Sequence, residues 1–200
     1  STGLAEFAGK LLERDRVAAV AEYAVFEFDF RRVALPEKRR TLTHLIGDVL
    51  AGFEARFLAI AGGEAEAPEG LLVMQDVMVA KGSVEVADPV HAVNKILSFE
   101  NDPELFAYAT SPGLLAAVRS LIGPSIQTIS TNVCNKPPEV DGRHPLHQDL
   151  RYFALRPVEG IVGTWTAISQ IDRQNGCLAI LPGSHRLGLL AHETEGGGGG

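Results

Sequence analysis

Short β-like runs separated by turn residues fill the segment from Ile126 to Ile180, and they constrain the fold more than any other feature of the chain. The runs are SIQTISTNVCN, YFAL, IVGTWTAIS and CLAIL, and each is rich in β-branched or aromatic side chains. They are bounded by the turn-forming groups Pro137-Pro138, Arg156-Pro157, Gln174-Asn175-Gly176 and Pro182-Gly183. Several short strands with such punctuation predict an antiparallel sandwich or jelly roll.

Helical patterns precede the β-like segment. Apolar residues recur at helical spacing in residues 4–12 and again in residues 42–53, where Thr41 and Thr43 are candidate caps. Between these two segments the run AVFEFDFRRVAL alternates with period two, as a half-buried strand does. The first part of the chain is therefore predicted to be mostly helical, with one short strand.

The middle of the chain contains a loop, a strand and a broken helix. The stretch AGGEAEAPEG is predicted to be a surface loop, and the following LLVMQDVMVA a strand that leads to a loop at Lys81 and Gly82. A helix is predicted from about Asp102 to Leu121, with Asp102 as its cap and Pro103 in its first turn. Ser111-Pro112-Gly113 should interrupt it.

Composition narrows the class of protein. The chain has 200 residues, of which 46% are hydrophobic, and this suits one domain with a substantial core. The net charge of -7, with 18 Lys+Arg against 25 Asp+Glu, argues against a nucleic-acid partner. The two cysteines, Cys134 and Cys177, form neither a disulfide framework nor a zinc ribbon, and no run of 18 apolar residues predicts a membrane span. We expect a soluble intracellular protein.

His147 and Asp149 form the main candidate for a metal site. On an extended segment residues i and i+2 point to the same face, so the imidazole and the carboxylate can reach one ion together. Such a pair is two thirds of the 2-His-1-carboxylate triad of non-haem Fe(II) oxygenases. An H-x-D spacing alone is a weak signal, and its weight depends on the surrounding sequence.

The surrounding motifs give the pair its context. They are NKPP at 135–138, RHPLHQDLRYF at 143–153, WTA at 165–167 and NGCLAILPGSH at 175–185, and in order and spacing they resemble the phytanoyl-CoA dioxygenase family. The similarity extends upstream through GLLVMQDVMVAKG, NKILSFENDPELFAYAT and LIGP, hence over roughly 70–192. Residues before Gly70 match poorly.

The resemblance implies a fold and a reaction. The expected fold is mixed α and β, with an incomplete double-stranded β-helix, or jelly roll, as the core and N-terminal helices packed on it. The expected cofactor is Fe(II), the cosubstrate is 2-oxoglutarate, and ascorbate is a further candidate. The expected substrate is a branched fatty acyl-CoA resembling phytanoyl-CoA, hydroxylated at its 2-position in fatty acid alpha-oxidation. The resemblance does not specify an oligomeric state.

The resemblance also implies roles for individual residues. By position, His147 and Asp149 match the family's first two iron ligands, and Lys95 matches a lysine that contacts 2-oxoglutarate. Trp165 matches a tryptophan that lines the same pocket, and Asn132 stands where close relatives carry a methionine. Without the resemblance, Lys95 would be a solvated lysine and Trp165 an ordinary core residue.

Two expected residues are not matched, a distal histidine as third iron ligand and an arginine that pairs with 2-oxoglutarate. His185 and His192 are poor substitutes for the histidine, and Arg186 resembles the arginine in residue type alone. His144 is better explained as a loop-ordering residue. The alternative is therefore a catalytically inactive β-helix protein with a binding or scaffold role. A zinc hydrolase is a weaker third reading, because no H-E-x-x-H motif occurs.

The predicted organisation has three parts. Residues 1–69 form an N-terminal helical region, residues 70–195 a partial dioxygenase β-helix domain, and residues 196–200 a glycine tail. We read the chain as a fragment. The resemblance implies a peroxisomal location, and the cytoplasm is the alternative, because no C-terminal S-K-L-type address occurs in this sequence.

Overall fold

The computed structural model describes residues 38–137, 146–152, 155–157, 160–169, 171–172, 174–181 and 183–190, with the backbone alone for 38–47 and 185–186. These residues fall into two compact units. The first, the helix–sheet unit, contains 38–137 and 165–169. The second, the metal-pair unit, contains the other described residues. The predicted helix at 4–12 and strand at 24–35 lie outside the described residues.

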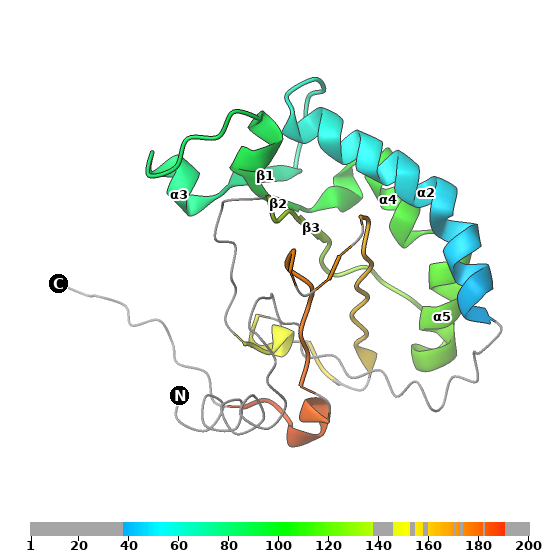
Figure 1. Ribbon diagram of the computed structural model, residues 1–200. Helices are drawn as coiled ribbons and strands as arrows, with labels where there is room; N and C mark the ends of the chain where they lie inside the picture. The colour runs from blue at the N-terminus through cyan, green and yellow to red at the C-terminus, as the bar shows by residue number, and fades with distance from the viewer. Residues whose placement is uncertain are drawn as a thin grey trace. The chain divides into compact units, whose positions relative to one another are not determined.

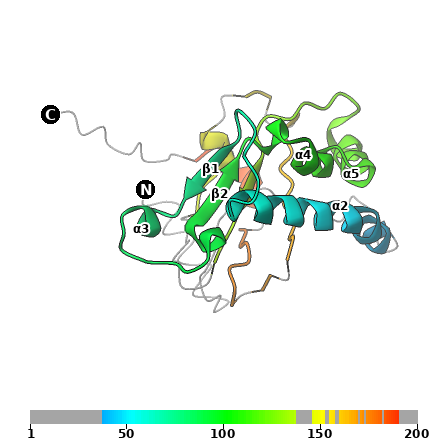
Figure 2. The ribbon, with the colours of Figure 1, turned by 90° about the horizontal axis from the view of Figure 1, so that it is seen from above.

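A long helix forms one side of the helix–sheet unit. Helix α2 spans Lys38–Ala61, which is longer than the predicted 42–53. Phe53, Phe57 and Ile60 recur at helical spacing, are all buried, and belong to the hydrophobic core. Helix α2 packs against α4 (Pro103–Ala109) and α5 (Pro112–Ile122), which lie beside it in Figures 1 and 2. The loop that follows it agrees with the prediction from AGGEAEAPEG.

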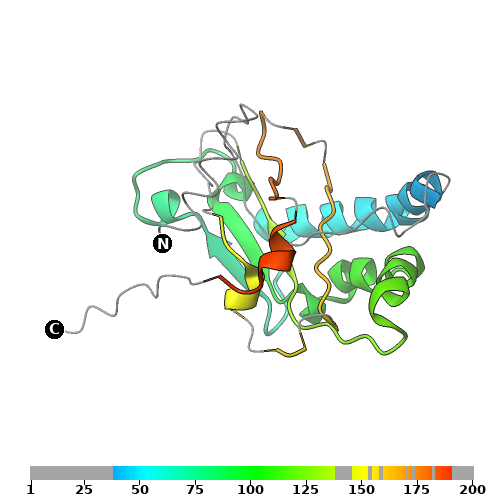
Figure 3. The ribbon, with the colours of Figure 1, turned by 90° about the horizontal axis from the view of Figure 1, so that it is seen from below.

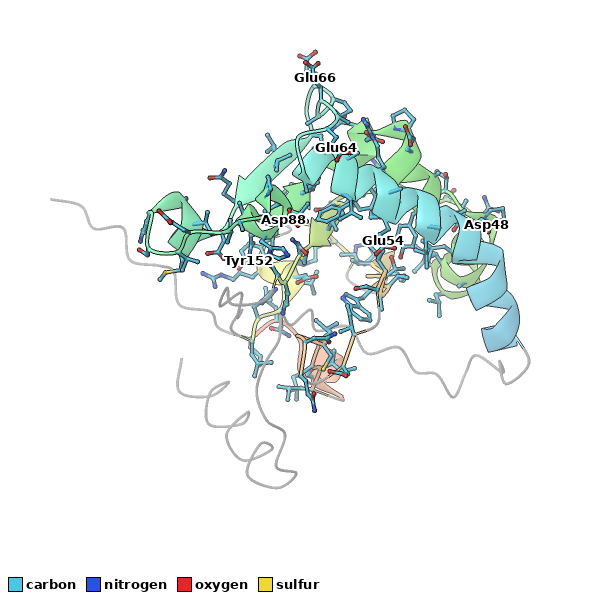
Figure 4. All side chains as sticks on the ribbon, turned by 45° about the horizontal axis from the view of Figure 1, so that its top comes forward. Asp48, Glu54, Glu64, Glu66, Asp88 and Tyr152 are labelled. Atoms are coloured by element: carbon cyan, nitrogen blue, oxygen red, sulfur yellow. The ribbon has the colours of Figure 1, made fainter. Side chains whose placement is uncertain are left out.

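Four exposed acidic side chains lie on α2 and in the loop that follows it. Asp48 and Glu54 lie on the helix, Glu64 and Glu66 lie in the loop that follows, and all four are exposed (Figure 4). These carboxylates form a solvated outer surface. The buried apolar residues of α2 face the core and its acidic residues face solvent. This explains why the helix lies at the surface of the core.

Among the described residues the sheet has three antiparallel strands in the order β1-β2-β3. They are β1 Leu72–Gln75, β2 Val93–Leu97 and β3 Asn132–Cys134. The row Val73, Ile96 and Val133 lies on one face, and the last two side chains are buried in the core with α2. The neighbouring rows, Leu72-Leu97-Asn132 and Met74-Lys95-Cys134, therefore lie on the opposite face. This opposite face, here called the open face, is the side seen in Figure 3.

The predicted broken helix is confirmed in its position, its cap and its interruption. Asp102 Oδ1 accepts hydrogen bonds from the backbone N–H groups of Glu104 (2.9 Å) and Leu105 (3.1 Å). Pro103 occupies the first turn of α4. Pro112 then starts α5, which ends at Gly123, where φ is 89°.

A buried ion pair fastens α2 to the start of α4. The Arg56 guanidinium donates from Nε to Asp102 Oδ2 at 2.8 Å, and the Asp102 side chain is 1% exposed. Burial raises the Asp102 pKa, but the hydrogen bonds from Arg56 and from the Leu105 and Glu104 N–H groups outweigh it, so the pKa is lowered overall. The hydrogen bond to Asp102 likewise raises the Arg56 pKa.

The strand predicted for LLVMQDVMVA is wrong in its second half. Strand β1 ends at Gln75, and Asp76 then caps the short helix α3, Val77–Ala80, by accepting from Met78 N at 2.7 Å. Val favours strands by propensity whereas Met is a good helix former, and a capping aspartate in the middle of the run allows the chain to turn into a helix. Strand β2 follows a 3-10 turn at Pro89–Ala92, and its sequence had not been predicted as a strand.

The β-like runs form fewer strands than predicted. Of SIQTISTNVCN only Asn132–Cys134 is a strand, and the described parts of YFAL, IVGTWTAIS and CLAIL belong to none. A strand exists only where its backbone pairs with a neighbour, so β-branched composition alone does not form one. The turn predicted at Gln174-Asn175-Gly176 is present, with Cys177 N donating to Asp172 O at 2.9 Å. The chain is thus a mixed helix-and-sheet protein with an open antiparallel sheet.

Within the described part of the chain, no single helix has both the length and the apolar composition needed to cross a membrane. Helices α4 and α5 satisfy those criteria only when taken together, and they are bent by 46° at the break between them.

Candidate metal and cosubstrate site

His147 and Asp149 converge on one another. The His147 Nε2 atom lies 3.2 Å from Asp149 Oδ1, and the two side chains are 18% and 25% exposed. Gln148 between them is extended, with φ -112° and ψ 128°, and Asp149 begins the 3-10 turn η3, Asp149–Arg151. The extended residue places its two neighbours on one face, as the H-x-D spacing indicates. An imidazole nitrogen and a carboxylate oxygen at this separation can both contact one divalent ion.

The Gln148 side chain points away from His147 and Asp149 and is fixed by two hydrogen bonds. Its side chain is 4% exposed, its Nε2 donates to Gly188 O at 2.8 Å, and its Oε1 accepts from Leu190 N at 2.7 Å. These bonds fix the backbone from which His147 and Asp149 project. This role of Gln148 was not predicted from the sequence. The sequence did offer a signal. The middle residue of H-x-D points to the face opposite His147 and Asp149, and a glutamine buried there needs hydrogen-bond partners.

An aromatic side chain flanks the imidazole. The Tyr152 ring stands edge-on to the His147 ring, with centroids 5.9 Å apart and an interplanar angle of 73°. The Arg151 guanidinium carbon lies 5.5 Å from the centroid of the same tyrosine ring. Tyr152 is 64% exposed and is labelled in Figure 4. The Tyr152 ring, at the end of η3, therefore contributes to orienting the imidazole.

A third ligand is not found among the described residues. Nowhere in the part of the chain that the structure describes do three His, Cys, Asp or Glu side chains gather to hold a metal. His185 belongs to the 3-10 turn η5, Ser184–Leu187, where its backbone alone is described. His144 and His192 lie outside the described residues. The observed donor set therefore fits two positions of a 2-His-1-carboxylate triad.

The cosubstrate candidates Lys95 and Asn132 lie on the open face of the sheet. Lys95 of β2 pairs with Met74 and Cys134, and Asn132 of β3 pairs with Leu97 in the next row. The Cys134 thiol donates to Asn132 Oδ1 at 3.4 Å, so the amide oxygen is engaged on its own strand. A lysine and an amide in adjacent rows of one open sheet face can receive an anionic ligand.

Trp165 lies in the helix–sheet unit and is not a core residue, since it is 55% exposed. Its neighbours fix the segment: the hydroxyl groups of Tyr108 and Thr166 are 2.5 Å apart, and Ile168 packs against the hydrophobic core. The interpretation of Trp165 as ordinary core is therefore wrong. An exposed indole on an anchored segment is available to line a pocket.

The family model that matches this sequence is "Phytanoyl-CoA dioxygenase (PhyH)", over residues 47–196. The match includes the metal pair, the open face of the sheet and the C-terminal part of α2. This match covers more than half of the chain. The chain belongs to the phytanoyl-CoA dioxygenase family.

Curated relatives agree with the family model. "Probable phytanoyl-CoA dioxygenase" of Caenorhabditis elegans is 42% identical over 147 residues, which cover 70% of this chain and 46% of the relative. "Phytanoyl-CoA dioxygenase, peroxisomal" of Bos taurus is 42% identical over 156 residues, covering 76% and 45%. The Homo sapiens protein of the same name is 45% identical over 129 residues, covering 63% and 38%. The chain thus spans less than half the length of the curated relatives it matches.

Proposed function

We propose that this chain belongs to an Fe(II)- and 2-oxoglutarate-dependent dioxygenase that hydroxylates a branched fatty acyl-CoA at its 2-position. The observation that carries the proposal is the convergence of His147 and Asp149 at 3.2 Å in a member of the phytanoyl-CoA dioxygenase family. Under the proposal the enzyme acts in fatty acid alpha-oxidation, and residues 70–195 are part of a jelly-roll domain. The names of the relatives favour a peroxisomal location.

The metal pair fits the proposed cofactor by donor chemistry. One imidazole nitrogen and one carboxylate oxygen are the donors that non-haem Fe(II) sites use, and both side chains are partly accessible. His147 and Asp149 would hold the ion. With 2-oxoglutarate, bound Fe(II) would supply the oxidising power that inserts one oxygen atom of dioxygen into a C–H bond.

The remaining roles belong to side chains of this chain. Gln148 keeps the two ligands on one face by holding the backbone between them. Lys95 would pair with a carboxylate of 2-oxoglutarate, since an ammonium on an apolar sheet face gives a charge-assisted hydrogen bond. Asn132 and Trp165 would line the same pocket, with Trp165 helping to exclude water.

The metal pair is tested by titrating the chain with Fe(II) under anaerobic conditions, and with Mn(II) as a redox-stable probe. His147→Ala and Asp149→Ala should each weaken metal binding by 10-fold or more, because each removes one of two identified ligands (about 10- to 100-fold is lost even for outer-shell partners). His91→Ala is the matched control, because His91 lies on the 3-10 turn Pro89–Ala92 away from the pair in sequence.

The reaction is tested by succinate release from 2-oxoglutarate with Fe(II), dioxygen and phytanoyl-CoA. Release that depends on the acyl-CoA and is lost in His147→Ala would support the dioxygenase. Metal binding without any succinate release would instead favour a non-catalytic β-helix protein, which the lack of a third ligand among the described residues also favours.

A further inference from the structure

Lys136 carries an unsatisfied cation. Its Nζ atom is buried and has no hydrogen-bond partner in the described structure. Removing an ammonium group from water without giving it a partner carries a large free-energy cost. Such a group is therefore expected to bind an anion. The family resemblance gave the NKPP motif, but it gave Lys136 no role.

The backbone around Lys136 is fixed by its neighbour. Asn135 N donates to Asn94 O at 2.8 Å, which continues the pairing of β3 with β2 by one residue. The Asn135 side chain donates from Nδ2 to Val90 O at 2.9 Å and to Val93 O at 3.0 Å. Three bonds therefore anchor the residue before Lys136, and the lysine projects from a defined position.

The strand alternation assigns Lys136 to the open face. Asn132 and Cys134 lie on that face, and Lys136 follows at the next alternate position. Lys136 precedes Pro137, which disfavours a helical backbone and keeps the lysine extended. Lys95 is directly opposite Cys134, so Lys136 is its diagonal neighbour, and diagonal neighbours in a sheet are about 7–8 Å apart, within reach of long side chains. Lys95 and Lys136 are thus both assigned to the open face.

We infer that Lys136 is a second cation of an anion site on the open face, and that with Lys95 it binds a dicarboxylate. This inference rests on the proposed function, because it assigns Lys136 to the cosubstrate site of that reaction. A flexible ammonium binds a carboxylate as a point charge, and the diagonal separation suits a ligand with a carboxylate at each end. The buried amine then gains the partner that it lacks among the described residues.

The ligand is tested on the metal-free full chain, with a chelator present, by calorimetric titration. The probes are glutarate, which has two carboxylates and no 2-oxo group, and butyrate, which has one carboxylate. Inorganic phosphate serves as the third probe. The wild-type chain should bind glutarate in preference to butyrate and phosphate. A preference for phosphate, or no binding of glutarate, would overturn the inference.

The residue is tested by Lys136→Met, with Lys136→Arg as the conservative variant. Lys136→Met should weaken glutarate binding by about 10- to 100-fold, the equivalent of one charge-assisted hydrogen bond, whereas Lys136→Arg should keep most of the affinity. Lys81→Met is the matched control, because Lys81 is an exposed lysine at the end of α3. Equal glutarate affinity in the wild type and Lys136→Met would refute the assignment.

Thermal unfolding without ligand separates binding from a structural role. Removing an unpartnered buried cation should leave the midpoint of Lys136→Met at or above that of the wild type. A lower midpoint would show that Lys136 has a protein partner and would contradict the inference.

The assay outcomes also separate this inference from the proposed function. Glutarate binding through Lys136 without succinate release from the Fe(II)-loaded chain would keep the site and refute the dioxygenase. Acyl-CoA-dependent succinate release whose KM for 2-oxoglutarate is unchanged by Lys136→Met would keep the dioxygenase and refute the site.

Discussion

The helix–sheet unit and the metal-pair unit are ordered by different kinds of contact. The first has a core of aromatic and aliphatic side chains from α2, the sheet and α4, joined by the buried pair of Arg56 and Asp102. The second, in its described part, has short turns and a few side-chain hydrogen bonds, among them the bond that Gln148 donates to Gly188 O and the bond that it accepts from Leu190 N. Burial of apolar area makes the first a stable platform, while the second depends on a few polar bonds.

This difference bears on how each part of the proposed site is built. Lys95 and Asn132 stand on one face because sheet register places them there, and the register is set by a buried row on the other face. His147 and Asp149 converge because Gln148 between them is extended, which places both side chains on one face. The cosubstrate residues therefore depend on the global fold and the metal residues on local geometry.

The largest expected effect on stability comes from breaking the buried pair with Asp102→Asn. Asparagine caps a helix as well as aspartate does, so the cap is kept and the charge is lost. Arg56 would be left without its main partner, and we expect the helix–sheet unit to lose about 3 kcal/mol of unfolding free energy in urea denaturation at neutral pH. The matched control is Asp88→Asn, an exposed cap at Pro89–Ala92, which should cost well under about 1 kcal/mol.

The pH dependence of the stability difference between the wild type and Asp102→Asn tests whether the pair of Arg56 and Asp102 is its source. The Asp102 pKa is lowered from its ordinary value of 3.8, so the unfolded chain binds the proton more readily than the folded chain. The stabilisation is therefore complete above this value and is lost as pH falls through the lowered pKa. The stability difference between wild type and Asp102→Asn should shrink below about pH 4. A difference that stays constant into acid would show that the pair is not its source.

An intermediate effect is expected from Gln148→Leu in the metal-pair unit. The change leaves Gly188 O and Leu190 N without their partner, at a cost of about 1–3 kcal/mol to local order. Because the backbone between the ligands loosens, we expect Mn(II) affinity to fall by about tenfold. Urea unfolding of the helix–sheet unit should not change. Gln174→Leu, at an exposed turn position, is the control and should alter neither measurement.

Either of two results would contradict this account of Gln148. Unchanged Mn(II) affinity would show that the turn η3 holds the pair without the glutamine. A large loss of urea stability in the helix–sheet unit would show that the two units unfold together, and the contrast between them would then fail.

The features predicted correctly from sequence are those set by neighbouring residues. Asp102, Pro103 and the break at Pro112 follow from capping and from the missing proline N–H, which act within one helical turn. The convergence of His147 and Asp149 has a similar local cause, while their role as metal ligands stays a prediction. The loop at 62–70 and the turn at 174–176 also follow from local backbone preferences.

The features missed from sequence depend on distant partners. The runs YFAL and CLAIL have the composition of strands, but the described residues pair with nothing that would make a ladder. Gln148 is buried because Gly188 and Leu190 return to it, some 40 residues later in the chain. The exposure of Trp165 and the buried Nζ of Lys136 likewise depend on packing that no local pattern encodes.

The smallest expected effect is the stabilising change Gly52→Ala. Gly52 lies in the interior of α2, is exposed, and a Cβ there would meet nothing within 4 Å. Alanine should raise the unfolding free energy by about 1 kcal/mol, because it loses less backbone entropy in a helix. The matched contrast is Gly70→Ala, since Gly70 has φ +87° and its Cβ would lie 3.0 Å from Asn101 Nδ2. That variant should lose about 1–2 kcal/mol.

Mn(II) titration of the two glycine variants tests the independence of the units. If the metal pair depends on local geometry, its affinity should be the same in Gly52→Ala and in the wild type, although the helix–sheet unit has become more stable. Gly70→Ala should also leave the affinity unchanged at temperatures where the protein stays folded. Metal affinity that rises with one variant and falls with the other would mean that the sheet platform positions His147 and Asp149. The metal pair would then depend on the same global fold as Lys95 and Asn132.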